Sequence, residues 1–270
     1  ESDRIISFMT REHGKLKGIA KGARRSRKRF VNNIEPMSHS TLVFFSNEKS
    51  ELVRIDDAAL IHGFAGLKTD IDRLSLGCYL LELTAEMTRE GQILPHVFGL
   101  LTGFLHKIEG TAEAEMLVRF FEIRLLSQLG YMPHLDGCVG CRTPLSEGLT
   151  VLFSSERGGA LCSPCSTGSP DLIGLSIGTA RFLSMAARLD TDKLQRLRPT
   201  PPCLRECDAA LSDFIRFQIG KELKTRRFLD KMRSSPNAGP RICNPIGRLS
   251  AVNPHGTETP QLPARLAVTV

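Results

Sequence analysis

The chain has 270 residues, of which 41% are hydrophobic and 24% charged, a composition typical of a soluble globular protein. No run of eighteen or more apolar residues occurs, so the sequence excludes a membrane-spanning helix, and no membrane partner is expected. Trp is absent and only two Tyr occur, so stacking on nucleic-acid bases would have to use Phe, His or Arg.

Positive charge is concentrated at the start of the chain. Residues 1–30 carry ten basic side chains against three acidic ones, and this excess of seven equals the formal net charge of +7 of the whole chain. The other residues nearly balance, so a polyanion would be attracted to one end of the protein. The ten basic residues are Arg4, Arg11, Lys15, Lys17, Lys21, Arg24, Arg25, Arg27, Lys28 and Arg29.

This basic segment has the pattern of a hairpin followed by a loop. Residues 5–10 predict a strand that turns at Gly14. Three lysines that follow share one parity, which puts them on one face of a second strand: Lys15, Lys17 and Lys21. The dense basic loop at residues 24–29 comes next, so all ten basic residues are candidate DNA contacts. The alternatives are a solvated edge strand protected by lysine and a basic localisation tract.

Two further strands are predicted at residues 41–45 and 51–55, joined by a polar turn. Several short strands with polar turns fit a small barrel, and the OB-fold is the small barrel that commonly binds single strands. Such a barrel has about five strands. Because the sequence shows four, we expect the missing first strand to precede Glu1. Residues 1–57 are assigned to an OB-fold nucleic-acid-binding domain.

The pattern becomes helical after the acidic pair at residues 56–57. Apolar residues recur at helical spacing in five segments, at residues 70–87, 95–106, 112–129, 176–189 and 204–232. These helices need one another to bury their apolar faces, so residues 58–235 are assigned to an α-helical domain. Residues 236–270 lack a sustained apolar period and are assigned to a flexible tail.

A second basic cluster lies near the end of the last helical segment. Its candidate DNA contacts are Lys221, Lys224, Arg226 and Arg227. Cations near a helix C-terminus are favoured by the helix dipole in any case, which is the alternative explanation for this cluster.

Two CxxC pairs interrupt the helical domain, formed by Cys138, Cys141, Cys162 and Cys165. Twenty residues separate the pairs, enough for a hairpin that returns the chain and brings four thiolates to one tetrahedral ion. A redox CxxC would not need a second copy, and unrelated buried cysteines are the other alternative. The spacing predicts one structural Zn²⁺ within a zinc finger at residues 134–170, in a reducing compartment. The expected fold class is therefore α+β with two domains.

Four blocks of the sequence resemble a known family: ESDRIISFMTREHGKLKGIAKGARRSRKRF, FFEIRLLSQLGYMPHLDGCVGC, FSSERGGALCSPC and LKTRRFL. The family is the bacterial recombination mediator RecO. The resemblance implies an OB-fold, a helical domain with a four-cysteine zinc site, and DNA repair by homologous recombination in the RecF pathway. It implies binding of single- and double-stranded DNA, strand annealing, and loading of RecA with RecR onto strands coated by single-strand-binding protein. A bacterial cytoplasmic, nucleoid-associated location follows.

The resemblance also implies a contact with the acidic C-terminal tail of single-strand-binding protein. Arg119 and Arg124 lie among apolar residues of one helix, so they are candidate partner-binding residues; ordinary arginines with buried stems are the alternative. No nucleotide-binding GxxxxGK[ST] motif occurs, and no catalytic residue is assigned. Two rival functions are a nucleic-acid enzyme with a structural zinc module, and a zinc-ribbon regulator or scaffold.

Overall fold

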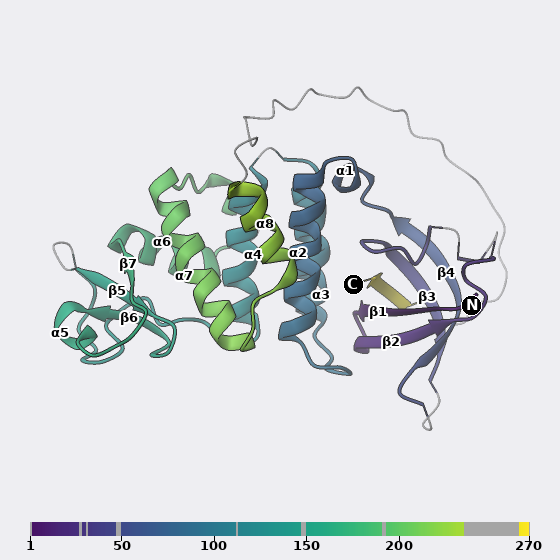
Figure 1. Ribbon diagram of the computed structural model, residues 1–270, viewed down its shortest axis with the longest axis horizontal. Coiled ribbons are helices and arrows are strands. Elements are labelled where there is room, and N and C mark those ends of the chain that lie inside the picture. Colours follow the sequence, from purple (N-terminus) through teal and green to yellow (C-terminus); the bar gives the residue numbers. More distant parts are fainter. Residues whose placement is uncertain are drawn as a thin grey trace.

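The computed structural model describes residues 2–26, 29–30, 32–46, 50–111, 113–146, 150–190, 193–234 and 265–269. It is an elongated α+β structure with helices in the middle. Figure 1 shows a β-barrel at one end and a small three-stranded sheet at the other.

The barrel is closed and five-stranded, with the order β1-β2-β4-β3-β8. Its neighbours pair antiparallel except for β2 and β4, which are parallel. Its interior contains Phe8, Leu42 and Ile55, each at most 2% exposed. The strands are β1 (Arg4–Thr10), β2 (Gly14–Ala20), β3 (His39–Phe45), β4 (Val53–His62) and β8 (Arg265–Thr269).

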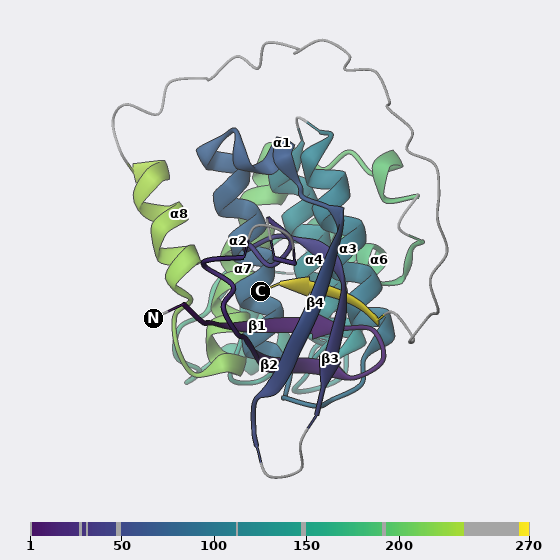
Figure 2. The same cartoon turned by 90° about the vertical axis from the view of Figure 1, so that its right-hand side faces the viewer.

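The strand that closes the barrel comes from the far end of the chain. β8 pairs with β1 and with β3, and Figure 2 shows it between the strands of the N-terminal segment. These residues fall in the range that the sequence assigned to a flexible tail, so that assignment is wrong for residues 265–269. Each of β1 and β3 has one edge free to pair, and an extended segment there satisfies backbone groups of both. The tail residues 236–264 and 270, with residue 235 before them, lie outside the described residues.

The hairpin of β1 and β2 forms as predicted. Gly14 adopts a φ of 69°, and a Cβ atom there would lie 2.0 Å from the carbonyl oxygen of Gln92. Glycine therefore allows both the turn and the close approach of the loop before α3.

β4 continues to His62, although the acidic pair predicted an end near residue 57. The ladder between β3 and β4 is offset between Val43 and Phe44, so Asp56 is the extra residue of a β-bulge. A bulge lets a strand accommodate one unpaired residue and continue.

Seven α-helices form the middle of the molecule or lead into it: α1 (Ala65–Lys68), α2 (Ile71–Met87), α3 (Pro95–Glu109), α4 (Ala114–Gln128), α6 (Ile177–Arg188), α7 (Pro201–Ile219) and α8 (Lys224–Ser234). A 3₁₀ turn lies at Leu194–Arg196. α4 contacts α2, α3, α6 and α7, and it is therefore apolar on nearly every side. Among the described residues no helix combines the length and apolarity needed to cross a membrane.

The prediction of one helix over residues 204–232 is wrong. Gly220 has a φ of 76° and ends α7, and α8 begins at Lys224. Glu82 of α2 caps the new helix, because its carboxylate accepts hydrogen bonds from the backbone N–H groups of Lys224 (3.0 Å) and Thr225 (2.8 Å).

The small sheet has the order β6-β5-β7 and packs on the helices. Phe153 lies in a T-shaped contact with Phe214 of α7, with ring centroids 5.8 Å apart. The elements are β5 (Val151–Ser154), β6 (Gly159–Cys162), α5 (Ser163–Ser166) and β7 (Ile173–Leu175).

Candidate nucleic-acid interface and metal centre

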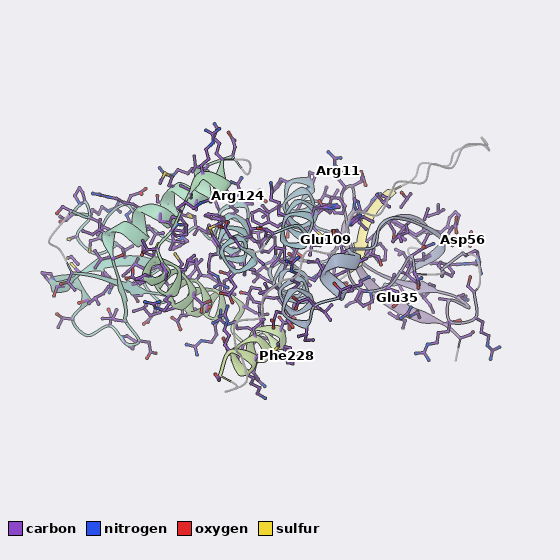
Figure 3. The ribbon with its side chains drawn as sticks, turned by 90° about the horizontal axis from the view of Figure 1, so that it is seen from above. Arg11, Glu35, Asp56, Glu109, Arg124 and Phe228 are labelled. Carbon is purple, nitrogen blue, oxygen red and sulfur yellow. The ribbon has the colours of Figure 1, made fainter. Side chains whose placement is uncertain are left out.

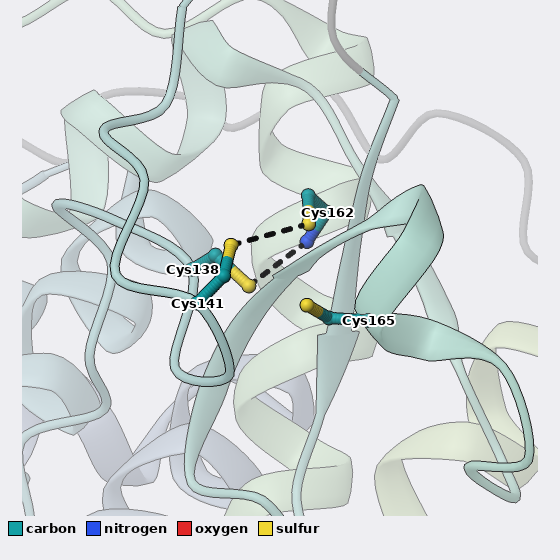
Figure 4. A group of neighbouring side chains, drawn as sticks. All are labelled: Cys138, Cys141, Cys162 and Cys165. Carbon is teal, nitrogen blue, oxygen red and sulfur yellow. Dashed lines mark hydrogen bonds between the residues drawn. The ribbon is translucent and has the colours of Figure 1, made fainter.

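The structure brings the four cysteines of the two CxxC pairs together. Their sulfur atoms all lie within 4.8 Å of one another. Cys138 and Cys141 come from the turn after Leu135, whereas Cys162 ends β6 and Cys165 lies in the following turn of α5. Figure 4 shows the four sulfurs facing one centre. Such a cluster can hold a metal ion.

Backbone N–H groups of this cluster favour ionised sulfur. Burial opposes ionisation of Cys138, but hydrogen bonds from the backbone N–H groups of Cys141, Cys162 and Gly140 lower its pKa to about 6. One of these, from Cys162 N to Cys138 Sγ, measures 3.4 Å. Cys165 behaves in the opposite way. Hydrogen bonds with the neighbouring sulfurs, of which that with Cys162 has the largest effect, raise its pKa to about 12. Four thiols at this spacing ionise together only when a cation offsets their charge.

Exposed positive charge gathers on the barrel where β2 ends. Lys21, Arg24 and Arg25 lie in the turn after β2, and none of them forms an ion pair with a described residue. Asp3 holds the turn in place: its carboxylate accepts a hydrogen bond of 2.8 Å from the backbone N–H of Gly22, which lowers the pKa of Asp3. These side chains are therefore free to meet phosphate groups.

Arg29 lies next to this turn. Its guanidinium donates to the carbonyl oxygen of Asp56 at 3.3 Å and lies 5.2 Å from the ring centroid of Phe30. We call Lys21, Arg24, Arg25 and Arg29 the basic end of the barrel. Arg27 and Lys28, also predicted to contact DNA, lie outside the described residues.

Arg54 adds to the basic end and escaped the sequence prediction. It lies opposite Ile19 in the ladder between β2 and β4, is exposed, and lies 3.5 Å from Asp56. Only the parallel pairing of β2 with β4, which local patterns do not reveal, brings it to this end.

Three of the other predicted contacts of the hairpin have partners within the protein, and a fourth lies at its opposite end. Arg4 makes a two-pronged ion pair with Glu35, and Lys17 pairs with Glu90 at 2.5 Å. The Lys15 ammonium group donates to backbone carbonyl groups at the end of α2, with 2.6 Å to that of Thr88. The lysine face of β2 therefore meets the helical domain. Arg11 is exposed at the opposite end of the hairpin, and Figure 3 shows it beside the helices, far from Asp56.

Comparison with known proteins covers both parts of this structure. The family model described as "Recombination protein O N terminal" matches residues 1–64, and the one described as "Recombination protein O C terminal" matches residues 68–227. The chain belongs to the RecO family. This confirms the resemblance seen in the sequence.

Relatives named "DNA repair protein RecO" align over most of their length. The one from Syntrophus aciditrophicus (strain SB) is 38% identical over 235 residues, which is 86% of this chain and 91% of the relative. The one from Anaeromyxobacter sp. (strain K) is 34% identical over 235 residues, again 86% of this chain and 91% of the relative. The one from Symbiobacterium thermophilum is 32% identical over 237 residues, 87% of this chain and 93% of the relative.

The second basic cluster of this RecO-family chain lies among carboxylates. Lys221 pairs with Glu86 at 2.8 Å, and Arg227 pairs with Glu222 at 2.7 Å. Arg226 pairs with Asp208 at 2.7 Å and with Asp230 at 3.0 Å. Lys224 is exposed and forms no ion pair with a described residue. Positive charge here is largely offset within the molecule.

Arg119 and Arg124 do not share a groove. Arg119 is 5% exposed, and its Nη1 lies 2.9 Å from Glu122 and 2.6 Å from Asp208, although neither contact is aligned as a hydrogen bond. Tyr79 donates to the other oxygen of Glu122 at 2.6 Å. Arg124 instead donates to the carbonyl of Leu189 at the end of α6. Residues five apart point roughly 140° away from each other on a helix, so the sequence spacing already favoured this separation.

Proposed function

We propose that this protein is a DNA repair and recombination mediator that binds single- and double-stranded DNA and anneals complementary strands. With RecR it helps to load RecA onto strands coated by single-strand-binding protein. Family membership supports the process, and the basic end of the barrel supports the DNA contact. The observation that carries the proposal is that Lys21, Arg24 and Arg25 are exposed together and unpaired among the described residues.

The barrel is an OB-fold in this proposal. Five strands close it, a single parallel pair joins β2 to β4, and β8 lies between β1 and β3. β8 is thus the fifth strand, and it closes the barrel that the four N-terminal strands leave open. OB-folds bind nucleic acid on their barrel surface, which is consistent with charge gathered there.

The mechanism requires charge and proximity and no catalytic group. Side chains of the basic end neutralise phosphates and release counterions, which gives binding that ignores base sequence and weakens with salt. Two complementary strands held on one basic surface repel each other less and are locally concentrated, so they anneal without nucleotide hydrolysis. We therefore assign a non-enzymatic role in the bacterial cytoplasm.

The four-cysteine cluster holds one structural Zn²⁺ in this proposal. Zn–S bonds of about 2.3 Å in a tetrahedron put neighbouring sulfurs about 3.8 Å apart. The Cys141 and Cys162 sulfurs are already 3.7 Å apart, which fits. A Cβ atom at Gly140 would lie 3.0 Å from the Cys165 sulfur, so glycine leaves room for the cluster. Four thiolates leave no open position on the ion, so its role is to fold residues 134–170.

The acidic tail of single-strand-binding protein binds, in this proposal, at the pocket beside Arg119. Arg205 and Leu204 of α7 offer an exposed cation and an apolar contact there. Glu115 and Asp208 also line the pocket and pair with Arg233, so Arg205 is the cation that remains for the tail. An acidic tail with an apolar tip needs this combination. A titration with the tail peptide should show weaker binding to Arg205→Ala, and unchanged affinity would argue against this pocket.

The test of the DNA contact is a salt series. The triple variant is Lys21→Ala, Arg24→Ala, Arg25→Ala. For single-stranded DNA its plot of log affinity against log salt should be shallower than that of the wild type, by about two units of slope. Lys17→Ala is the matched control, because its ammonium group is already paired with Glu90. Annealing should proceed without nucleotide triphosphate and fail as salt rises. An unchanged slope in the triple variant would show that the basic end does not contact DNA. Metal-dependent cleavage of DNA would favour the rival function of a nucleic-acid enzyme.

A further inference from the structure

Three metal-binding side chains meet where the barrel joins the helices. His62 ends β4, and His106 and Glu109 lie in the last turn of α3. One ligand atom from each lies within 4.8 Å of the other two. The Nε2 atom of His62 lies 2.7 Å from Oε2 of Glu109, and the two imidazole centroids are 4.5 Å apart. Figure 3 shows Glu109 at this junction.

The surrounding backbone orients Glu109. Its Oε1 atom accepts a hydrogen bond of 2.8 Å from the backbone N–H of Gly66, which leaves Oε2 directed at His62. A Cβ atom at residue 66 would lie 2.8 Å from Glu109 Cγ, so glycine permits this approach. A carboxylate fixed through one oxygen and free at the other is a typical arrangement for a metal ligand.

The histidines are positioned by packing. Phe64 is fully buried, with its ring centroid 4.7 Å from that of His62 and 4.8 Å from that of His106. Its φ is 46°, a conformation that a bulky side chain rarely adopts and that the surrounding structure must stabilise. Strained residues of this kind gather at binding sites, and the ring of this one contacts both imidazoles.

Two imidazoles at this junction have ring nitrogens without partners. His106 is exposed, and its ring makes no hydrogen bond to a described residue, so its nitrogens are accessible to a ligand. His39 lies opposite His62 in the ladder between β3 and β4, and both of its ring nitrogens are enclosed and unpaired within the described part of the chain. Buried polar groups are nearly always satisfied, so the enclosed ring of His39, next to the three side chains, is incompletely partnered within the described residues.

We propose that His62, His106 and Glu109 bind one Zn²⁺ ion that links the barrel to the helical domain, separate from the four-cysteine cluster. Two imidazoles and one carboxylate are a ligand set typical of Zn²⁺. His106 and Glu109 are three residues apart and therefore share a helix face, as metal ligands on helices do. Ligand atoms around such an ion are about 3.3 Å apart, so His62 and Glu109 separate slightly while His106 moves inward.

The ion has a mechanical consequence. β4 and α3 belong to different domains, so a bond from each to one ion fixes the direction of the barrel relative to the helices. The three protein ligands leave a fourth position for water.

The experiment counts metal on the full chain. Protein stripped with a chelator is dialysed against micromolar Zn²⁺ and analysed by mass spectrometry of the elements. The wild type should hold two ions per chain and His106→Ala one. His96→Ala is the matched control, because His96 is exposed on the same helix outside the cluster, and it should keep two. One ion in the wild type, or two in His106→Ala, would overturn the proposal.

A cobalt titration separates the two sites. Thiolate-to-cobalt absorption reports the four-cysteine cluster, and it should be the same in the wild type and in His106→Ala. A second, weaker set of cobalt bands without thiolate character should appear only in the wild type and His96→Ala. Glu109→Gln keeps an acceptor for the Gly66 N–H but removes the charge, and it should weaken the second binding step by roughly tenfold or more. If the second cobalt-binding step were unchanged in Glu109→Gln, the Glu109 carboxylate would not be a ligand of the ion.

Discussion

The ammonium group of Lys15 lies 2.6 Å from the carbonyl oxygen of Thr88, which places a predicted DNA contact of the barrel at the end of a helix in the other domain. It also donates to the carbonyl of Ala85. Burial lowers the pKa of Lys15. A cation at the C-terminal end of α2 satisfies carbonyl groups that the helix leaves unpaired and interacts favourably with its dipole.

Lys15→Met should therefore lower stability and leave DNA binding nearly unchanged. Hydrogen bonds from a charged donor contribute about 2 kcal/mol, so we expect a loss of that order in the free energy of unfolding, measured with urea. Lys17→Met is the control on the same strand face, and its exposed ion pair should contribute less than about 1 kcal/mol. A loss of DNA affinity in Lys15→Met without a loss of stability would contradict this role.

Asp208 connects three helices through charge. It contacts Arg119 of α4 at 2.6 Å, and Arg226 and Arg233 of α8 at 2.7 and 3.3 Å. Burial opposes ionisation of Asp208, but the hydrogen bond from Arg226 and the charges of the three arginines lower its pKa to about 2, from an ordinary value of 3.8. A carboxyl group whose pKa is lower in the folded than in the unfolded protein stabilises the folded state at any pH above its unfolded pKa. That stabilisation is lost as the pH falls through the pKa of the folded protein.

The resulting contribution is about 2 kcal/mol, present above pH 4 and lost between about pH 4 and pH 2. Asp208→Asn should cost roughly 3–5 kcal/mol at pH 7, because it leaves the buried Arg119 short of negative charge. Urea unfolding between pH 5 and pH 3 should show the difference from the wild type shrinking as the pH falls. Asp190→Asn, with an exposed pair to Lys193, is the control and should change little. A difference that is constant with pH would refute the charge argument.

Local patterns predicted the elements of this fold well. The Ser176 side chain caps α6, accepting from Thr179 N at 3.2 Å, and Gly130 follows α4 with a φ of 81°. The CxxC spacing likewise predicted the sulfur cluster. These features depend on residues close together in the chain, whose conformational preferences are readable from the sequence.

Long-range pairing could not be predicted in the same way. Lys17 and Glu90 meet only because the hairpin packs on the loop before α3, and the regular alternation of lysines therefore did not indicate an exposed face. The start of α8 is capped by Glu82, which lies in a helix far earlier in the chain. Residues 204–232 show only a continuous apolar period, which therefore did not indicate the break at Gly220. Of the twelve described basic side chains that the sequence counted as available for DNA, seven have carboxylate or carbonyl partners.

Removal of the Zn²⁺ ion proposed for the four-cysteine cluster should unfold that segment and loosen α7. Phe153 of β5 packs on Phe214, so disorder in the small sheet would remove an apolar contact of that helix. With a chelator or in Cys162→Ser, hydrogen exchange should accelerate over residues 137–175 and, less strongly, over α7. Cys203→Ser is the control, because this cysteine lies outside the cluster. Equal exchange with and without chelator would show that no structural ion is held there.

Closure of the barrel by β8 predicts that the end of the chain contributes to stability. Ala267 lies opposite Thr10 of β1 and Ser40 of β3, so its backbone is within both ladders. Ala267→Pro removes a backbone N–H and imposes a φ of about −65°, which a strand between two neighbours does not tolerate. We expect faster hydrogen exchange in β1 and β3 and a lower denaturation midpoint. Ala267→Val keeps the N–H and suits a strand, so it should behave like the wild type. A free tail would give the same exchange in all three proteins, because a proline outside any ladder removes no hydrogen bond from the barrel.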